Sequence, residues 1–194
     1  MRLIRSQSYR RMPWKNGGGE TIEIAVYPPE ASTSDFDWRV SMAKVEGDGP
    51  FSAFPDIDRT LTILEGQGIA LSVDGGEPVG ITDAPHSFPG DRPASARLLD
   101  GPVTDLNVMT RRGRHTHRVT PIALKGSKDI MMMAPVVLLY CHDGRATVEE
   151  EFVASMALEQ GDTLLIDGMP NGLSLSAAEP SRFYLIEISP VRPA

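Results

Sequence analysis

Three segments of the sequence place an apolar face opposite a face of compact polar side chains. In residues 21–26, 38–43 and 105–109 apolar side chains alternate with polar ones, and alternate positions of a β-strand point to the same side of the sheet. The polar positions are Thr21, Glu23, Arg39, Ser41, Asp105 and Asn107. Arginine, serine, aspartate and asparagine suit fixed, directional hydrogen bonds, whereas solvent faces usually carry Lys, Glu, Gln and Thr. Two interpretations stay open, a polar ligand pocket and a solvent-facing surface.

A further arginine, Arg59, opens the strand predicted after residues 51–58. An arginine at the mouth of a β-barrel can hold a carboxylate through two parallel hydrogen bonds. The alternative for Arg59 is an ion pair with Asp56 or Asp58, which precede it closely in the chain.

A glycine run at residues 17–19 lacks the Gly-Lys-Ser/Thr ending of a phosphate-binding loop. It is typical of a tight or mobile loop before a strand. Lys15 and Asn16 come just before the run and could present an ammonium and an amide to a ligand. A loop without ligand contact and a loop that contacts the ligand both stay open.

Metal and nucleophile chemistry find little support in the sequence. His115 and His117 form an HxH pair, but no glutamate follows within ten residues. We therefore expect no catalytic metal, and we expect no other cofactor. The sequence has no GxSxG motif, and Cys141 lies in an apolar segment where a buried, inert thiol is the ordinary case.

Composition and charge exclude several classes of protein. The 194 residues carry a net charge of −7, which argues against nucleic-acid binding and against an anionic membrane surface. Apolar residues make up 41% and charged residues 23%, as in ordinary globular proteins. The single cysteine excludes an internal disulfide. The first residues lack the apolar stretch of a signal peptide, so we expect a cytoplasmic protein.

The elements that must position these side chains are short strands. Helical periodicity is hard to find, and 18 glycines and 16 prolines punctuate short alternating runs. We expect less than about 15% helix, against a usual third. Strands are predicted near 20–27, 38–45, 60–65, 68–73, 95–99, 103–110, 116–120, 136–141, 144–149, 152–158, 163–167, 172–176 and 182–188.

The two halves of the chain repeat one pattern. Residues 60–73 and 136–148 each give a strand, a turn ending in glycine and a second strand, which predicts a hairpin in each half. A Gly-Asp pair follows in both halves, at residues 90–91 and 161–162. This order is typical of a cupin barrel. It predicts an all-β bicupin, with two β-barrel (double-stranded β-helix) halves at residues 1–112 and 113–194 that share strands. The exposed strand edges leave a monomer and a homodimer both open.

Six motifs, in order, resemble those of the HutD/Ves family. They occupy residues 12–21, 35–41, 49–55, 58–59, 64–66 and 101–111, and the second half of the chain matches only loosely. Asp56 departs from the family pattern, which has glycine in this turn. The resemblance implies a bicupin without the usual metal ligands and a link to bacterial histidine utilisation.

Carried onto matching positions, the resemblance implies a ligand-binding set that overlaps the polar faces. The set is Trp14, Asn16, Thr21, Glu23, Arg39, Ser41, Arg59, Asp105 and Asn107. Such a mixture of charges suits a small polar acid, and urocanate, formylglutamate and formate are the candidates. We expect metal-independent binding of such an acid in an accessory or regulatory role. A metal-independent isomerase or hydrolase, with Glu23 or Asp105 as general base, and a structural or partner-binding protein are the alternatives.

Overall fold

The computed structural model describes residues 1–14, 17–149, 155–168 and 172–191. In these residues it contains the strands β1 to β17 and a single short 3-10 helix, Ser6–Ser8. The all-β prediction is therefore confirmed. No helix in the described part of the chain is long and apolar enough to span a membrane.

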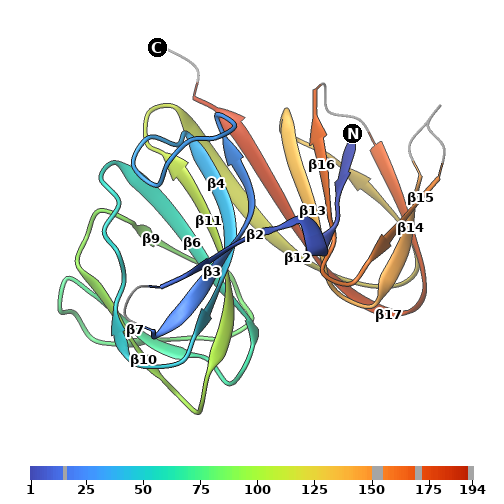
Figure 1. Ribbon diagram of the computed structural model, residues 1–194. Coiled ribbons are helices and arrows are strands. Elements are labelled where there is room, and N and C mark those ends of the chain that lie inside the picture. The colour runs from blue at the N-terminus through green and yellow to red at the C-terminus, as the bar shows by residue number, and fades with distance from the viewer. Residues whose placement is uncertain (15–16, 150–154, 169–171, 192–194) are drawn as a thin grey trace. The chain divides into compact units, whose positions relative to one another are not determined.

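The strands form two compact units. The first unit comprises Tyr9–Thr116 and the chain from Pro190, and the second comprises Met1–Ser8 and His117–Ser189. Two long strands, β12 (His115–Met131) and β17 (Gly172–Pro190), belong almost entirely to the second unit: only the first two residues of β12 and the last residue of β17 fall in the first. In Figure 1 the strands of the first unit run mostly from blue to yellow-green, and those of the second are mostly orange and red.

The first unit contains two antiparallel sheets. The six-stranded sheet has the order β2 (Arg10–Pro13), β3 (Gly19–Tyr27), β4 (Trp38–Val45), β11 (Val103–Arg111), β6 (Ile57–Glu65) and β9 (His86–Pro89). The four-stranded sheet has the order β5 (Gly49–Pro50), β10 (Ala94–Leu98), β7 (Ile69–Val73) and β8 (Val79–Ile81).

The core of the first unit lies between these sheets. Leu61 and Ile63 of β6 belong to one apolar cluster with Ile69 and Leu71 of β7. We call the side of the six-stranded sheet that carries Leu61 and Ile63 its inner face. The central strands β4 and β11 are buried on both faces, so polar side chains on their inner face are withdrawn from water.

The second unit is built on a seven-stranded sheet with an apolar interior. Its order is β1 (Arg2–Ile4), β16 (Thr163–Asp167), β13 (Val136–Asp143), β17, β14 (Arg145–Glu149) and β15 (Met156–Glu159), and β12 also pairs with β17. Buried aliphatic side chains such as Leu139, Leu158 and Leu164 dominate its core.

The predicted hairpins are wrong in both halves. Strand β6 pairs with β11 and β9, whereas β7 pairs with β10 and β8, so the turn between them connects two sheets. In the second unit β13 and β14 each pair with β17 and not with one another. Glycines make these sharp corners: Gly68 has φ 112°, and a Cβ there would lie 2.4 Å from the carbonyl oxygen of Ile81. The strand-turn-strand pattern is present, but it marks a corner of each barrel.

The Gly-Asp pairs lie at different turns of the two units. Residues 90–91 connect β9, which pairs with β6, to β10, which pairs with β7. Residues 161–162 connect β15, which pairs with β14, to β16, which pairs with β13. The amide of Gly90 donates to Ile57 O over 2.7 Å, and that of Gly161 donates to Cys141 O over the same distance. Each following aspartate binds an arginine, Asp91 with Arg112 and Asp162 with Arg5. The Gly-Asp part of the internal repeat therefore does not mark equivalent turns, because Ile57 begins β6 whereas Cys141 lies near the end of β13.

A candidate ligand-binding site on the inner face of the first unit

The antiparallel register arranges the predicted polar residues in three rows across the inner face. The first row is Arg39, Met109, Arg59 and Phe88. The second row is Glu23, Ser41, Asn107, Leu61 and His86. The third row is Thr21, Ala43, Asp105 and Ile63.

Five of these polar residues are almost fully buried. Arg39, Ser41, Arg59, Asp105 and Asn107 each expose 6% of their surface or less. The solvent-facing interpretation is therefore wrong for them. Burying several charged and polar groups on one face is costly unless each finds partners, so their hydrogen bonds decide what the face can do.

Arg39 forms an ion pair with Glu23 from the neighbouring strand. Its Nε donates to Glu23 Oε2 over 2.6 Å, and both side chains are largely buried. Within the described residues, neither terminal amino group of Arg39 has a hydrogen-bond partner. One edge of the guanidinium is thus fixed, and the other is available.

Arg59 binds a neutral amide. Its Nε donates to Asn107 Oδ1 over 2.6 Å, and Asn107 Nδ2 donates in turn to Asp105 Oδ1. No carboxylate among the described residues pairs directly with Arg59, and its terminal amino groups have no partner there. Burial lowers the pKa of Arg59 to about 10, and the nearby charge of Asp105 partly opposes that shift. Arg59 therefore stays cationic at neutral pH.

Two phenylalanines flank the Arg59 guanidinium. Its central carbon lies 4.4 Å from the ring centroid of Phe51 and 5.5 Å from that of Phe88. The two rings are themselves 6.3 Å apart. Such cation–π contacts stabilise a buried guanidinium. Because the two rings are closer to each other than rings on opposite faces would be, they lie on adjacent sides of the Arg59 guanidinium.

Asp105 has an unusual electrostatic environment. Burial raises its pKa to about 6, against the opposing effects of the Arg59 charge and of the hydrogen bond from Asn107. A carboxyl group with such a pKa exchanges its proton near neutral pH, as a general acid or base must.

The remaining predicted residues are uncharged. Trp14 Nε1 donates to Thr21 Oγ1 over 2.8 Å, which joins the end of the Trp14 segment to β3. In the described part of the chain no hydrogen-bond partner is found for the Ser41 hydroxyl. Asn16, and Lys15 beside it, lie outside the described residues.

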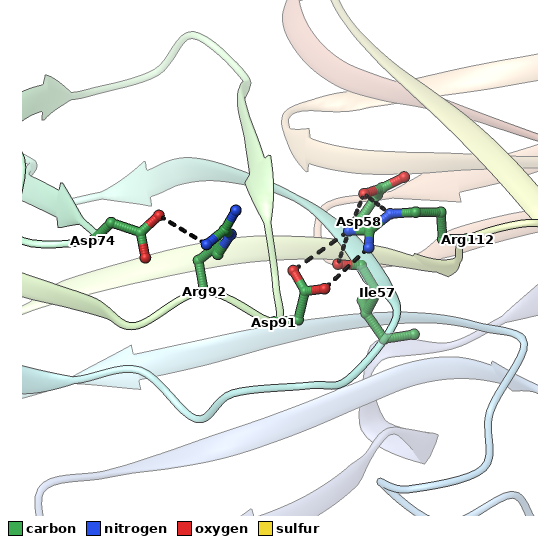
Figure 2. Close-up of polar contacts among 6 residues, drawn as sticks. All are labelled: Ile57, Asp58, Asp74, Asp91, Arg92 and Arg112. Carbon is green, nitrogen blue, oxygen red and sulfur yellow. Dashed lines mark hydrogen bonds and ion pairs between the residues drawn. The ribbon is translucent and has the colours of Figure 1, made fainter.

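An exterior cluster explains why Arg59 does not pair with Asp58. Figure 2 shows Arg112 between two carboxylates, with Nη2 2.8 Å from Asp58 Oδ1 and Nη1 3.0 Å from Asp91 Oδ2. Successive residues of β6 point to opposite faces, so Asp58 stays with Arg112 outside while Arg59 points inward. Both pairings suggested for Arg59, with Asp56 and with Asp58, are therefore wrong.

Asp56 adopts the left-handed backbone conformation, with φ 59°. Its carbonyl oxygen accepts a hydrogen bond from the amide of Arg112 over 2.7 Å. The turn thus keeps the geometry that favours glycine even with aspartate in place, because short polar side chains tolerate it better than most.

The candidate metal and nucleophile residues lie elsewhere. His115 packs edge-on against Tyr27, with ring centroids 6.4 Å apart. Cys141 is buried, and burial raises its thiol pKa to about 12. Across the described ranges, no three His, Cys, Asp or Glu side chains gather as a metal site would require.

Sequence reasoning missed Phe51, Phe88 and His86 on this face. Phe51 lies in one of the quoted motifs, but only its contact with Arg59 reveals its role. His86 and Phe88 belong to the four-residue strand β9, which is too short to show a clear alternation.

Comparison with known proteins identifies the family. The family model described as HutD matches residues 6–185, which is most of the chain. The chain belongs to the HutD family. The predicted resemblance is therefore confirmed, and it extends well beyond the first half of the chain.

Proteins from several bacteria resemble this chain. An uncharacterised 21.2 kDa protein of the hutC 3′ region in Pseudomonas putida is 35% identical over 97% of both chains. The protein Ves of Citrobacter koseri is 44% identical over 54% of this chain and 56% of its own length. The solved structure of HutD from Pseudomonas fluorescens SBW25, described as a formate condition, has 32% identity and a TM-score of 0.83. It covers 98% of this chain and 99% of its own.

A more distant likeness concerns the fold alone. Oxalate decarboxylase from Lactobacillus farciminis superposes with a TM-score of 0.70 at 10% identity, covering 97% of this chain and 86% of its own. This enzyme has the cupin fold, so the predicted bicupin fold class is confirmed.

Proposed function

We propose that this HutD-family chain binds a small polar carboxylic acid on the inner face of its first unit without a metal. The observation that carries the proposal is the state of Arg39 and Arg59. Both guanidiniums are almost fully buried, both are fixed through Nε, and both keep terminal amino groups without partners in the described residues. A carboxylate would supply the missing acceptors through charged hydrogen bonds.

The balance of charge supports an anionic ligand. Glu23 faces Arg39, but Arg59 faces a neutral amide, and Asp105 holds its proton more readily than an ordinary carboxyl group. An anion next to Arg59 would therefore meet an incompletely compensated positive charge. A large apolar ligand would leave these buried groups unpaired at roughly 1–3 kcal/mol each.

The biological role that we propose is accessory or regulatory, in histidine utilisation. The support is family membership and the hutC 3′ region of the Pseudomonas putida relative. Formate, urocanate and formylglutamate are the acids to test first, since each carries a carboxylate and is small.

Binding is tested by calorimetry and thermal shift with these three acids. We expect at least one to bind the parent protein, and Arg39→Ala or Arg59→Ala to weaken it by about 1.5–3 kcal/mol, the size of a charged hydrogen bond. Lys44→Ala is the matched control, because Lys44 is on β4 with Arg39 but is half-exposed on the opposite face. Failure of all three acids to bind, together with a large loss of melting temperature in both arginine variants, would favour a closed structural network.

A second candidate function is metal-independent catalysis. The buried Asp105, with a pKa of about 6 beside a bound acid, is the observation that favours it. Incubating the protein with each acid and following the mixture by proton NMR separates the two functions. Unchanged spectra with a bound acid support binding alone, and a new product that disappears in Asp105→Asn supports catalysis.

A further inference from the structure

His86 shares the inner face with the two arginines. Strand β9 alternates: Ser87 bonds Thr60 on the outer side, whereas Phe88 packs into the apolar core of the inner side. His86 is two residues from Phe88 and pairs with Leu61, an inner-face residue of β6. Its partly buried imidazole therefore projects from the row that also holds Asn107 and Ser41.

The ring of Phe88 contacts both His86 and Arg59. The imidazole lies 6.4 Å from the ring of Phe88, inclined by 33°, and Phe88 is one of the two rings that flank the Arg59 guanidinium. Arg59 pairs directly with Phe88, so His86 is its diagonal neighbour, with β-carbons about 7 Å apart in such a sheet. Both side chains can therefore reach the same ligand from neighbouring positions of the inner face.

The imidazole has unused hydrogen-bonding capacity. Neither ring nitrogen of His86 has a hydrogen-bond partner among the residues described. The imidazole packs against the ring of Phe88. Imidazole both donates and accepts hydrogen bonds, so it can pair with an amide, an amine, a ring nitrogen or a carboxylate. His86 is therefore suited to bind a second polar group of a ligand whose carboxylate is held by Arg59.

We propose that His86 is a specificity-determining residue that hydrogen-bonds a second polar group of the ligand while Arg59 holds its carboxylate. This inference rests on the proposed function. It narrows the ligand class to short acids with a polar group at the far end and a flat or unsaturated stem that lies against Phe88. A one-ended acid such as formate fills the Arg59 end alone and does not reach His86.

The test compares three acids by calorimetry on the full chain. Urocanate has a propenoate stem and a polar ring, cinnamate has the same stem and an apolar ring, and formate has the carboxylate alone. His86→Phe keeps an aromatic ring but removes both nitrogens. We expect it to weaken urocanate by about fivefold to tenfold, as for one lost hydrogen bond, and to leave cinnamate and formate within about twofold. His115→Phe is the matched control, because His115 contacts Tyr27 and not the arginine rows.

The outcomes separate this inference from the proposed function. If Arg59→Ala abolishes urocanate binding and His86→Phe does not change it, the His86 assignment is wrong and the acid site stands. If the parent protein binds formate and binds urocanate and formylglutamate no more tightly, the proposed preference for acids with a second polar group is wrong. If no acid binds the parent protein, both proposals fail.

A measurement on the parent protein guards against misfolding of the variant. The imidazole nitrogen resonances of His86 are followed by NMR during titration with urocanate and with formate. We expect saturating urocanate to shift them by more than saturating formate does. Equal or absent shifts at saturation overturn the inference without any substitution.

Discussion

Arg59 donates its Nε hydrogen to the side-chain oxygen of Asn107 over 2.6 Å, and Asn107 separates the guanidinium from the carboxyl group of Asp105. A guanidinium can only donate hydrogen bonds, so the amide must turn its oxygen to Arg59 and its NH₂ group to Asp105. The cation and the acid are thus neighbours that do not neutralise each other by direct contact. This relationship leaves Arg59 without a direct carboxylate partner, while burial raises the pKa of Asp105 to about 6.

Replacing Arg59 by lysine separates charge from geometry. Lysine keeps the positive charge but has neither the Nε–H that binds Asn107 nor a plane to stack on Phe51. We expect Arg59→Lys to weaken the acid that the parent protein binds by at least about tenfold, close to Arg59→Ala, since an oriented charged bond contributes about 1.5–3 kcal/mol. Calorimetry with the parent protein, Arg59→Lys and Arg59→Ala decides the matter. Parent-like affinity in Arg59→Lys would mean that charge alone suffices.

Removing the Asn107 amide should destabilise the fold. Asn107→Ala leaves Arg59 Nε and one oxygen of Asp105 buried without their partner, and an unsatisfied buried group costs about 1–3 kcal/mol. Urea unfolding measures the loss. Ser41→Ala is the control in the same row, because no partner is found for that hydroxyl among the described residues, and we expect a smaller effect. Equal losses in the two variants would contradict a bridging role for Asn107.

Asp105 should make stability depend on pH. Its folded pKa of about 6 lies above its ordinary value of 3.8, so between these values the folded state holds a proton that the unfolded state has released. Stability from this group is complete below pH 3.8 and declines as the pH rises through 6, by about 3 kcal/mol at 1.4 kcal/mol per pKa unit.

Asp105→Asn tests this pH dependence, because it imitates the protonated form at every pH. Between pH 4.5 and pH 7.5 the titration of Asp105 lowers the unfolding free energy of the parent protein. We expect Asp105→Asn to lack this loss, so its stability relative to the parent rises with pH. Urea unfolding of both proteins at the two pH values gives the comparison. Parallel pH profiles would show that Asp105 does not titrate in this window.

Gly144 allows a test of close packing in the second unit. Its φ is 80°, and a Cβ there would lie 2.3 Å from Ser181 Oγ. We expect Gly144→Ala to destabilise the protein by both backbone strain, about 1 kcal/mol, and a steric clash. Gly101→Ala is the control for strain alone, since Gly101 has φ 67° and a methyl group added there would have no neighbour within 4 Å. Combining Gly144→Ala with Ser181→Gly removes the clash, so we expect the double variant to regain the part of the stability that was lost to it. Thermal unfolding measures this recovery, and its absence would contradict a steric clash with Ser181.

The alternation of side chains is enough to predict the polar face. Period-two patterns select Thr21, Glu23, Arg39, Ser41, Asp105 and Asn107, and the register brings them into adjacent rows. Most of the longer strands are predicted as well, because each carries several alternations. The local pattern therefore contains the information about which side chains share a face.

Partners across the sheet could not be predicted, because they depend on register between distant strands. Arg59 has two aspartates within three positions in the chain, yet it bonds Asn107, which is 48 residues away. The long strands β12 and β17 were also missed in part, since Pro121 and Pro180 within them interrupt the sequence pattern. Prolines are tolerated where strands lack a ladder partner, a condition that only the folded sheet defines.

The pairing of β1 with β16 has a consequence for synthesis of the chain. Leu3 lies opposite Leu164, so β1 is synthesised long before the strand with which it pairs. The first unit, by contrast, has nearly all of its strands within residues 9–116 and can fold while the second is still being translated. Long-range pairings of this kind close slowly. Until β16 has been synthesised, β1 therefore has no strand with which to pair in this sheet.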